Sequence, residues 1–301
     1  MTYILSVIRQ KEGNMELVIL SAKEYKEKGK NYGDCIIIDD NDTCIIYDCG
    51  SEEHAERVLK YLDEKGIEKF DIVLSHNDED HYNGIPTLLE SGRVGKVYTL
   101  LVLKYIDEIL DKIDDNRKTR DSLKEQIKTT YDKIYQLRNY DCELVDAIQT
   151  VNINDGIKCV GPTKEYFIEA TSKLLNTLES DQIDSETICN ATSVQIEVLV
   201  GNQKLLLTGD SNFTAIEDKI TQYDLIQLPH HGKKQQAEEI FEKNQGRNQV
   251  RYYISDNTGN SNGGSDDLET LGHIVKNTKY DDDIVLDEAN TITSYSNYYG
   301  I

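Results

Sequence analysis

SHNDEDHYNGI, at residues 75–85, follows directly after a short apolar run at residues 72–74. Within six positions it carries side chains that bind metals, and these are His76, Asp78, Asp80 and His81. Imidazole and carboxylate together suit zinc, manganese or iron(II), and loops that follow buried strands often carry function in α/β folds. The alternative is a polar loop rich in Asp and His by chance, which is disfavoured because the whole chain has only 6 His. The pattern predicts a metal-binding loop.

Two further motifs place polar residues directly after apolar strands. LPHHG at residues 228–232 contains His230 and His231, and LLLTGDSN at residues 205–212 contains Asp210. Each motif is weak by itself, because paired histidines and Gly-Asp also occur in ordinary turns. Taken with the first loop, they form a series of strand-end clusters in the order HNDEDH, TGD and PHHG. Such a series indicates one shared metal centre.

Hydrophobic periodicity predicts alternating strands and helices. The expected strands are residues 15–21, 35–38 and 44–47 (a hairpin), 72–74, 157–160, 193–199 and 204–208 (a second hairpin), 225–228 and 251–254. The expected helices are residues 52–64, 165–178, 236–244 and 267–276. This alternation predicts an α/β fold, which we interpret as a single domain over residues 1–301.

Residues 103–139 differ in character from the rest of the chain. A helical period of apolar residues is interrupted by the polar run DDNRKTRDS and then resumes, with Ser122 and Glu125 in the spacing of a capping box. We expect a helical hairpin inserted into the main domain. It carries no cluster that suggests chemistry, so we interpret it as an insertion packed on the main body, a lid, or a contact for a second copy or a partner protein.

Composition excludes some classes of protein. The formal net charge of −22 excludes a broad basic face for nucleic acid, and the carboxylates favour either plain solubility or the binding of divalent cations. The six cysteines are dispersed and form no CxxC pair. No apolar run reaches the length of a membrane span or a signal segment. We therefore expect reduced thiols, no membrane association and a cytoplasmic location.

The motifs resemble the metallo-β-lactamase superfamily, whose first metal motif is HxHxDH, followed by a bridging Asp and a late His. Within it, they are most similar to the hydrolase domain of DNA-uptake competence proteins (ComEC-like), which has SHxDxDHxxG and a downstream PHHG. Further similarities to this branch are the stretches GDCI at residues 33–36, IIYDCG at 45–50, Gly161-Pro162 and NATS at 190–193. The resemblance implies an α/β fold of the αββα four-layer sandwich type, with the helical hairpin inserted.

The resemblance also implies a set of site residues. The implied ligands are His76 and Asp78 for a first metal ion, Asp80, His81 and either His230 or His231 for a second, and Asp210 as the bridge. Asp80, His81 and Asp210 would also be catalytic, and Asp34 and Asp48 would be supporting residues. One or two divalent ions per chain, manganese or zinc, would be bound. His54 and His273 are interpreted as core or surface residues, not as ligands.

The chain departs from the family pattern in four places, one of which is the late GHP-type loop, replaced here by residues 262–266. Asp78 stands where the wider superfamily has His, which favours a harder ion such as manganese. No His occurs between His81 and His230, so the first site lacks a middle-region ligand and is expected to be weak or empty. The competence branch continues HHG with Ser, and this chain has Lys233 and Lys234 there.

The expected activity is metal-dependent hydrolysis of a phosphodiester in DNA, RNA or a nucleotide, with a hydroxide held between the metals as nucleophile. The expected residues for an anionic substrate are Lys233, Lys234, Asn257 and Ser265. Two alternatives stay open. One is hydrolysis of a lactone, thioester or amide on the same scaffold, since a fold does not determine a substrate. The other is a low-activity metal-binding module that docks a partner.

Overall fold

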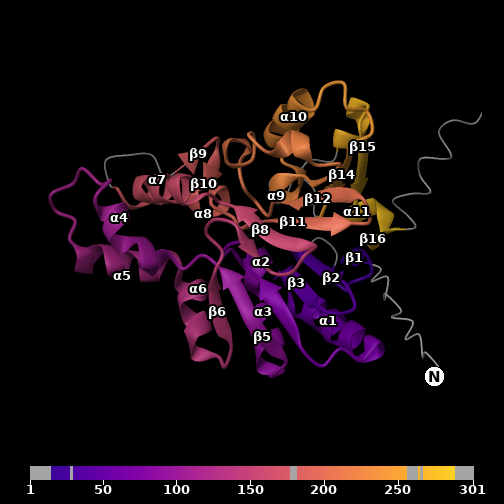
Figure 1. Ribbon diagram of the computed structural model, residues 1–301, viewed down its shortest axis with the longest axis horizontal. Coiled ribbons are helices and arrows are strands. Elements are labelled where there is room, and N and C mark those ends of the chain that lie inside the picture. Colours follow the sequence, from indigo (N-terminus) through magenta and orange to yellow (C-terminus); the bar gives the residue numbers. More distant parts are fainter. Residues whose placement is uncertain (1–14, 28–29, 177–181, 256–263, 265–266, 289–301) are drawn as a thin grey trace, which may run out of the picture.

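The computed structural model describes residues 15–27, 30–176, 182–255, 264 and 267–288, without the side chains of residues 269 and 270. Two seven-stranded sheets lie face to face with helices outside them, which confirms the predicted α/β sandwich (Figure 1). Asn257 and Ser265, which were expected to contact substrate, lie outside the described residues. No helix of the described part of the chain is long and apolar enough to cross a membrane.

The first sheet has the strand order β16-β1-β2-β3-β4-β5-β6. Its strands are β1 (Glu16–Ile19), β2 (Cys35–Asp39), β3 (Cys44–Cys49), β4 (Phe70–Val73), β5 (Val94–Thr99), β6 (Glu143–Asp146) and β16 (Ile284–Asp287). Every residue of β2 and β3 is buried. Their continuous apolar sequences therefore reflect a sheet that is covered on both faces.

The second sheet has the strand order β15-β14-β13-β12-β11-β8-β7. Its strands are β7 (Val151–Asn152), β8 (Ile157–Gly161), β11 (Gln195–Val200), β12 (Gln203–Leu207), β13 (Leu225–Gln227), β14 (Arg251–Ile254) and β15 (Ile274–Asn277). A separate two-stranded ribbon pairs β9 (Gln182–Ile183) with β10 (Glu186–Thr187). Both hairpins expected from the sequence are present, as β2–β3 and β11–β12.

The two sheets share one pattern of strand direction. In each, three antiparallel pairs are followed by three parallel pairs, and the parallel part begins with β3–β4 in the first sheet and with β12–β13 in the second. The carboxyl ends of parallel strands lie at one edge of a sheet, where α/β folds place their ligands. The metal-binding motifs all follow β4, β12 and β13.

Helices lie outside the two sheets and in the loops that connect the strands. They are α1 (Glu52–Lys65), α2 (Glu79–Tyr82), α3 (Ile85–Glu90), α4 (Ile106–Leu110), α5 (Arg120–Thr130), α6 (Asp132–Gln136), α7 (Lys164–Leu175), α8 (Ile188–Ala191), α9 (Pro229–Gly232), α10 (Lys234–Lys243) and α11 (Thr278–Asp281). In Figure 1, α1 lies at the lower right, beside the first sheet, and α10 lies above the second. Helix α1 begins at Ser51, whose side chain caps the His54 amide, and ends at Gly66 in the left-handed conformation.

Residues 103–139 form several short helices at one side of the sandwich, at the left of Figure 1. Their apolar side chains, including Ile109, Leu123 and Ile127, belong to the main hydrophobic core. The predicted cap at Ser122 is wrong. Thr119 is the N-cap of α5 and Ser122 is its third residue, because the Ser122 amide donates to the Thr119 hydroxyl. Whether the segment can be removed without harm to the metal site stays a prediction.

The predicted last helix at residues 267–276 is also wrong. A short 3₁₀ helix (Leu268–Leu271) ends at Gly272, and β15 then pairs in parallel with β14. Local spacing suggested a helix, but pairing with the open edge of the second sheet satisfies the backbone of this segment instead. After α11 the chain returns to the first sheet as β16, beside β1, a strand that the apolar spacing did not reveal.

Candidate metal centre

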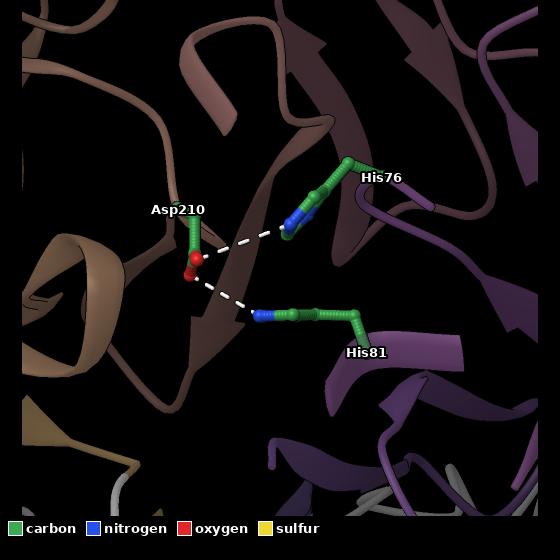
Figure 2. Close-up of side chains that lie close together, drawn as sticks. All are labelled: His76, His81 and Asp210. Carbon is green, nitrogen blue, oxygen red and sulfur yellow. Dashed lines mark ion pairs between the residues drawn. The ribbon is translucent and has the colours of Figure 1, made fainter. Parts of the chain in front are cut away.

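The centre lies where the loops after β4, β12 and β13 meet between the two sheets. His76 and His81 come from the loop that follows β4, and both side chains are completely buried. Asp210 comes from the loop that follows β12 and is 2% exposed. Figure 2 shows the two imidazoles pointing toward the Asp210 carboxylate from the opposite side of the site. Residues far apart in the sequence thus form one cluster.

Asp210 faces a different imidazole with each of its carboxylate oxygens. Its Oδ1 lies 3.2 Å from Nε2 of His81, and its Oδ2 lies 3.9 Å from Nε2 of His76. Asp78 approaches from the solvent side, with Oδ2 3.7 Å from Nε2 of His76. A carboxylate in this arrangement is able to bridge two cations. The bridging role that the family resemblance implies for Asp210 stays a prediction.

A second group of ligand atoms surrounds Asp80. Nε2 of His231 lies 3.1 Å from Oδ2 of Asp80, and Nδ2 of Asn31 donates to the same oxygen at 2.9 Å. The structure therefore places His231, and not its neighbour His230, beside Asp80 and His81. Among the described residues, two groups have ligand atoms that all lie within 4.8 Å of one another. One group is His76, His81 and Asp210, and the other is Asp80, His81 and His231.

The buried polar atoms of the centre fit a metal. Nε2 of His76, Nε2 of His81 and Oδ1 of Asp210 are buried and make no hydrogen bond with the described part of the chain. Unsatisfied buried polar atoms are costly, and here they all lie toward one another. Imidazole nitrogen and carboxylate oxygen are ligands of zinc, manganese and iron. The donor set is thus able to hold divalent ions.

Carboxylates behind the histidines determine which ring nitrogen faces the centre. Oδ2 of Asp48 lies 2.8 Å from Nδ1 of His81, and Asp48 also accepts hydrogen bonds from the amide and hydroxyl of Ser75 at 2.7 and 2.6 Å. Asp34 accepts from Nε2 of Gln227 at 2.9 Å and lies 3.1 Å from Nδ1 of His231. With Nδ1 occupied in this way, Nε2 is left for a metal, which is the usual arrangement around metal-binding histidines. The structure places Asp34 and Asp48 where supporting residues were expected.

The backbone of the first loop is held by two glycines. The Asp80 carbonyl accepts a hydrogen bond from the Asp34 amide at 2.9 Å. A Cβ atom on Gly33 would lie 1.8 Å from that carbonyl oxygen, and a Cβ on Gly50 would lie 2.1 Å from it. Gly33 also has φ +68°, which favours glycine. These positions therefore require glycine so that the Asp80 backbone can pack closely.

The second loop has an unusual backbone conformation. His230, His231 and Gly232 have φ values of 49°, 54° and 78°, so α9 is not a regular helix. Non-glycine residues with positive φ cost free energy, and they cluster at functional sites. His231 is further held by its Nδ1, which lies 2.9 Å from the Ser255 carbonyl oxygen. The unusual backbone lets two consecutive imidazoles both reach the centre.

Mutual charge shifts the pKa values of the buried groups. Burial by itself lowers the pKa of His81, but the carboxylates of Asp210 and Asp48 outweigh this effect and hold it well above its ordinary value. Burial raises the pKa of Asp210, but the imidazole of His81 and its neighbours outweigh it and hold this pKa below the usual range. Protons on the imidazoles would compete with a cation, so metal binding would release protons.

The two lysines expected at the substrate are both paired with acids. Nζ of Lys233 lies 2.8 Å from Oε1 of Glu186 and donates to the Ser185 carbonyl. Nζ of Lys234 lies 2.6 Å from Asp267. The substrate roles of Lys233 and Lys234 therefore stay a prediction. Glu186 is a residue that sequence reasoning missed, because a single Glu in a polar stretch carries no motif.

The two histidines interpreted as non-ligands lie outside the centre. His54 is completely buried in α1, and burial lowers its pKa to about 3. His273 stacks on Phe241 with ring centroids 4.0 Å apart.

Ser193 is a further contact of the centre, with its hydroxyl 3.2 Å from Nδ1 of His76. It belongs to the stretch NATS that the sequence resemblance had singled out.

Comparison with known proteins identifies the family. The sequence profile described as the metallo-beta-lactamase superfamily matches residues 29–255. The chain therefore belongs to the metallo-β-lactamase superfamily, whose members are metal-dependent hydrolases that use divalent ions. No curated protein matches the chain.

The chain is similar to several solved structures. The metallo-beta-lactamase fold protein YhfI from Bacillus subtilis is 12% identical, with a TM-score of 0.54, and the match covers 92% of this chain and 100% of that one. A diphosphatase of the PhnP family is 13% identical (TM-score 0.46, covering 91% and 98%), and the short form of human tRNase Z is 11% identical (TM-score 0.45, covering 90% and 98%). At 12% identity the likeness to YhfI shows the fold alone.

Proposed function

We propose that this protein is a hydrolase of phosphodiesters that works with two divalent metal ions. The observation that carries the proposal is the position of Asp210 between two imidazoles. Its Oδ1 faces His81, which belongs to both groups of ligand atoms, and its Oδ2 faces His76, which belongs to the first group alone. Paired ions are the usual device of phosphatases and nucleases, because they stabilise both the attacking and the leaving oxygen of a displacement at phosphorus.

Different residues of the site would have different roles. Bound ions would supply Lewis acidity and a water of lowered pKa. Asp80, His81 and Asp210 would hold the second ion and the bridge, with Asp34 and Asp48 behind them to orient the imidazoles. The Asp78 side chain is 44% exposed and that of His230 is 20% exposed, whereas His76, His81 and Asp210 are buried. Substrate would therefore approach on the side of Asp78 and His230.

The carboxylate-rich donor set supports a hard ion such as Mn²⁺. Asp78, Asp80 and Asp210 contribute carboxylates where a zinc site is often dominated by nitrogen and sulfur. A hard ion suits phosphate oxygens. The sequences SHNDEDHYNG and PHHG also support our proposal that the chain belongs to the competence-type branch of the superfamily.

A substrate panel tests the proposal. Purified protein, loaded with Mn²⁺ or Zn²⁺, is assayed with bis(p-nitrophenyl) phosphate, a nitrophenyl ester, a thioester, a lactone and a chromogenic β-lactam. We expect turnover of the phosphodiester to exceed the others, and to be lost in Asp210→Ala. Faster turnover of the lactone, thioester or lactam would favour the alternative hydrolase. Absence of any turnover in a metal-loaded protein would favour a partner-docking module.

We also propose a cytoplasmic location. All six cysteines are free thiols, and four of them, Cys35, Cys44, Cys49 and Cys159, are buried. Free buried thiols are typical of a reducing compartment. A role for residues 103–139 in binding a second copy or a partner protein likewise stays a proposal, to be tested by measuring the molar mass in solution.

A further inference from the structure

The segment at residues 103–139 forms much of the wall of a cavity that the metal centre does not use. The cavity has a volume of about 350 Å³ and lies between the carboxyl end of β5, strand β6 and the helices α5 and α6. Its buried wall includes Leu100, Ile127 and Ile134, which are 0%, 2% and 5% exposed. None of the residues that line it belongs to the metal centre. Cavities of roughly 300–1,000 Å³ are the usual size of small-molecule sites.

The interior of this cavity is mainly apolar. Besides the buried wall, the side chains of Leu101, Leu103 and Leu144 line the cavity and are only half-buried. Moving such apolar surface out of water is favourable, so a concave apolar site binds apolar groups. The cavity therefore suits an alkyl chain and not a phosphate or a sugar.

Cations, and no acids, join the apolar residues that line the cavity. The lining includes Lys104, Lys128 and Arg138, and none of its described residues is Asp or Glu. Lys104 and Lys128 each pair with an acidic side chain outside the lining, at 2.8 and 2.7 Å. In a chain of net charge −22, three cations at one cavity are a local exception that attracts an anionic group. The expected ligand thus has an apolar chain and a negative charge.

Arg138 is the cation best placed to hold that charge. Its Nε donates to the Tyr135 carbonyl at 2.9 Å, and its guanidinium carbon lies 3.6 Å from the centre of the Tyr135 ring. Within the described part of the chain, Arg138 makes no ion pair and its two terminal nitrogens make no hydrogen bond. The stacked guanidinium is therefore held at the cavity with donors left for a ligand. Arginine binds carboxylates through two parallel N–H groups.

We propose that this cavity binds a free medium-chain fatty acid, with the alkyl chain against Leu100, Ile127 and Leu144 and the carboxylate on Arg138. The limited volume suits one short alkyl chain, not the paired chains of a membrane lipid. Residues 103–139 would then bind a ligand of their own, apart from the hydrolytic centre. This inference does not rest on the proposed function.

Calorimetric titration of the Mn²⁺-loaded protein with hexanoate, octanoate and decanoate tests the proposal. We expect one decanoate to bind per chain, with an affinity that rises roughly 4-fold for each added methylene, because each one removes more apolar area from water. Decanol and decyltrimethylammonium have the same chain without the negative charge. They should bind at least ~10-fold more weakly, because they lose the charged hydrogen bonds to Arg138.

Two variants change the cavity itself. Leu144→Phe places a larger side chain in it and should lower the affinity for decanoate at least ~5-fold, the smaller cost of forcing extra atoms into a packed site. Arg138→Gln should lower the affinity ~10-fold and remove the preference for decanoate over decanol. Arg120→Gln is the matched control, because it removes the same charge from the same segment outside the lining, and it should bind decanoate as wild type does. Circular dichroism and metal content would establish that each variant is folded with its centre intact.

Several results would overturn the proposal. One is failure of decanoate to bind at all. Another is equal binding of decanoate to wild type, Leu144→Phe and Arg138→Gln, which would place it elsewhere, such as on the metal ions. Protein that does not bind decanoate but sediments with phosphatidylglycerol vesicles would use this surface for a membrane. Protein that dimerises without binding decanoate would use it for a second copy.

Discussion

The two sheets contribute to the metal centre with the same layout of strands but with different loops. In the first sheet, β3 and β4 carry Asp48 and the loop with His76 and His81. In the second, the corresponding strands β12 and β13 are followed by Asp210 and by the loop with the histidine pair. The first strand of each pair thus supplies a buried acid, and the second supplies imidazoles.

The two loops achieve this in different ways. In the loop after β4, every ligand comes from one short sequence, and the residues that orient it, such as Asp48 and Ser75, are completely buried. In the loop after β13, the histidines adopt a left-handed backbone and depend on distant partners, Glu186 and Ser255. Both loops therefore depend on partners from elsewhere in the chain, since Asp48 lies 33 positions from His81 and Ser193 lies 117 positions from His76. The difference teaches that only the second loop also needs a left-handed backbone to present its two imidazoles.

Asp210→Ala should lower the affinity for metal more than the other changes, because Asp210 joins the loop after β4 to the loop after β13. Loss of a partner behind a ligand already costs ~10–100-fold in affinity, so loss of the shared ligand should cost more than ~100-fold, and metal-dependent activity should disappear. His81→Ala should behave similarly. Metal analysis after dialysis, together with an unfolding curve, measures this. Full metal content in a folded Asp210→Ala protein would refute its bridging role.

Gly33→Ala should damage the first loop through its backbone. The new Cβ would collide with the Asp80 carbonyl, and the positive φ would add strain of ~1–2 kcal/mol. We expect overpacking to add ~1–3 kcal/mol and the affinity for metal to fall. Urea unfolding and Mn²⁺ titration measure the two effects.

Gly66→Ala is the matched control for Gly33→Ala. Gly66 has the same φ of +68°, but a Cβ there would meet nothing within 4 Å. It should therefore lose only the ~1–2 kcal/mol of strain and bind metal normally. Equal losses of metal affinity in the two variants would show that strain, and not contact with Asp80, is responsible.

Gly232→Ala should disturb the loop after β13 less than Gly33→Ala disturbs the loop after β4. Its φ is +78°, and the nearest atom to a new Cβ is Cδ1 of Ile254 at 2.8 Å. Because that atom is the end of a flexible side chain, we expect a loss of ~1–2 kcal/mol in stability, mainly from backbone strain. Metal affinity should fall by ~10-fold, the lower end for a displaced ligand shell. A larger loss of metal affinity than in Gly33→Ala would reverse the comparison of the two loops.

Asn77→Ala should have the smallest effect on stability and metal binding. It tests whether residues 103–139 support the loop after β4. Nδ2 of Asn77 donates to the Thr130 carbonyl at the end of α5 at 3.0 Å. Removing one such hydrogen bond costs about 1 kcal/mol. We expect this loss in urea unfolding with an unchanged number of bound metal ions. A lowered metal content would show that the helical segment helps to hold the ligand loop.

Much of the fold was predictable because the relevant signals are local. The hairpins β2–β3 and β11–β12 follow from apolar runs joined by polar turns, and α1 follows from its apolar period. Two local patterns were misleading. Ser122 was expected to cap a helix whose N-cap is Thr119, and residues 267–276 have helical spacing but pair with the edge of the second sheet. An edge strand is defined by its neighbour, and its sequence alone does not reveal one.

By itself the sequence determined the candidate ligands that lie close together in one loop, from His76 to His81, since such clustered residues carry their own chemistry wherever the chain folds. It also marked Asp210 and the histidine pair as candidates. Only the tertiary structure decided which histidine lies beside Asp80, and that Glu186 stands behind the other. These are contacts between residues 44 to 151 positions apart, and distances between such residues arise from the packing of the two sheets, not from any local pattern.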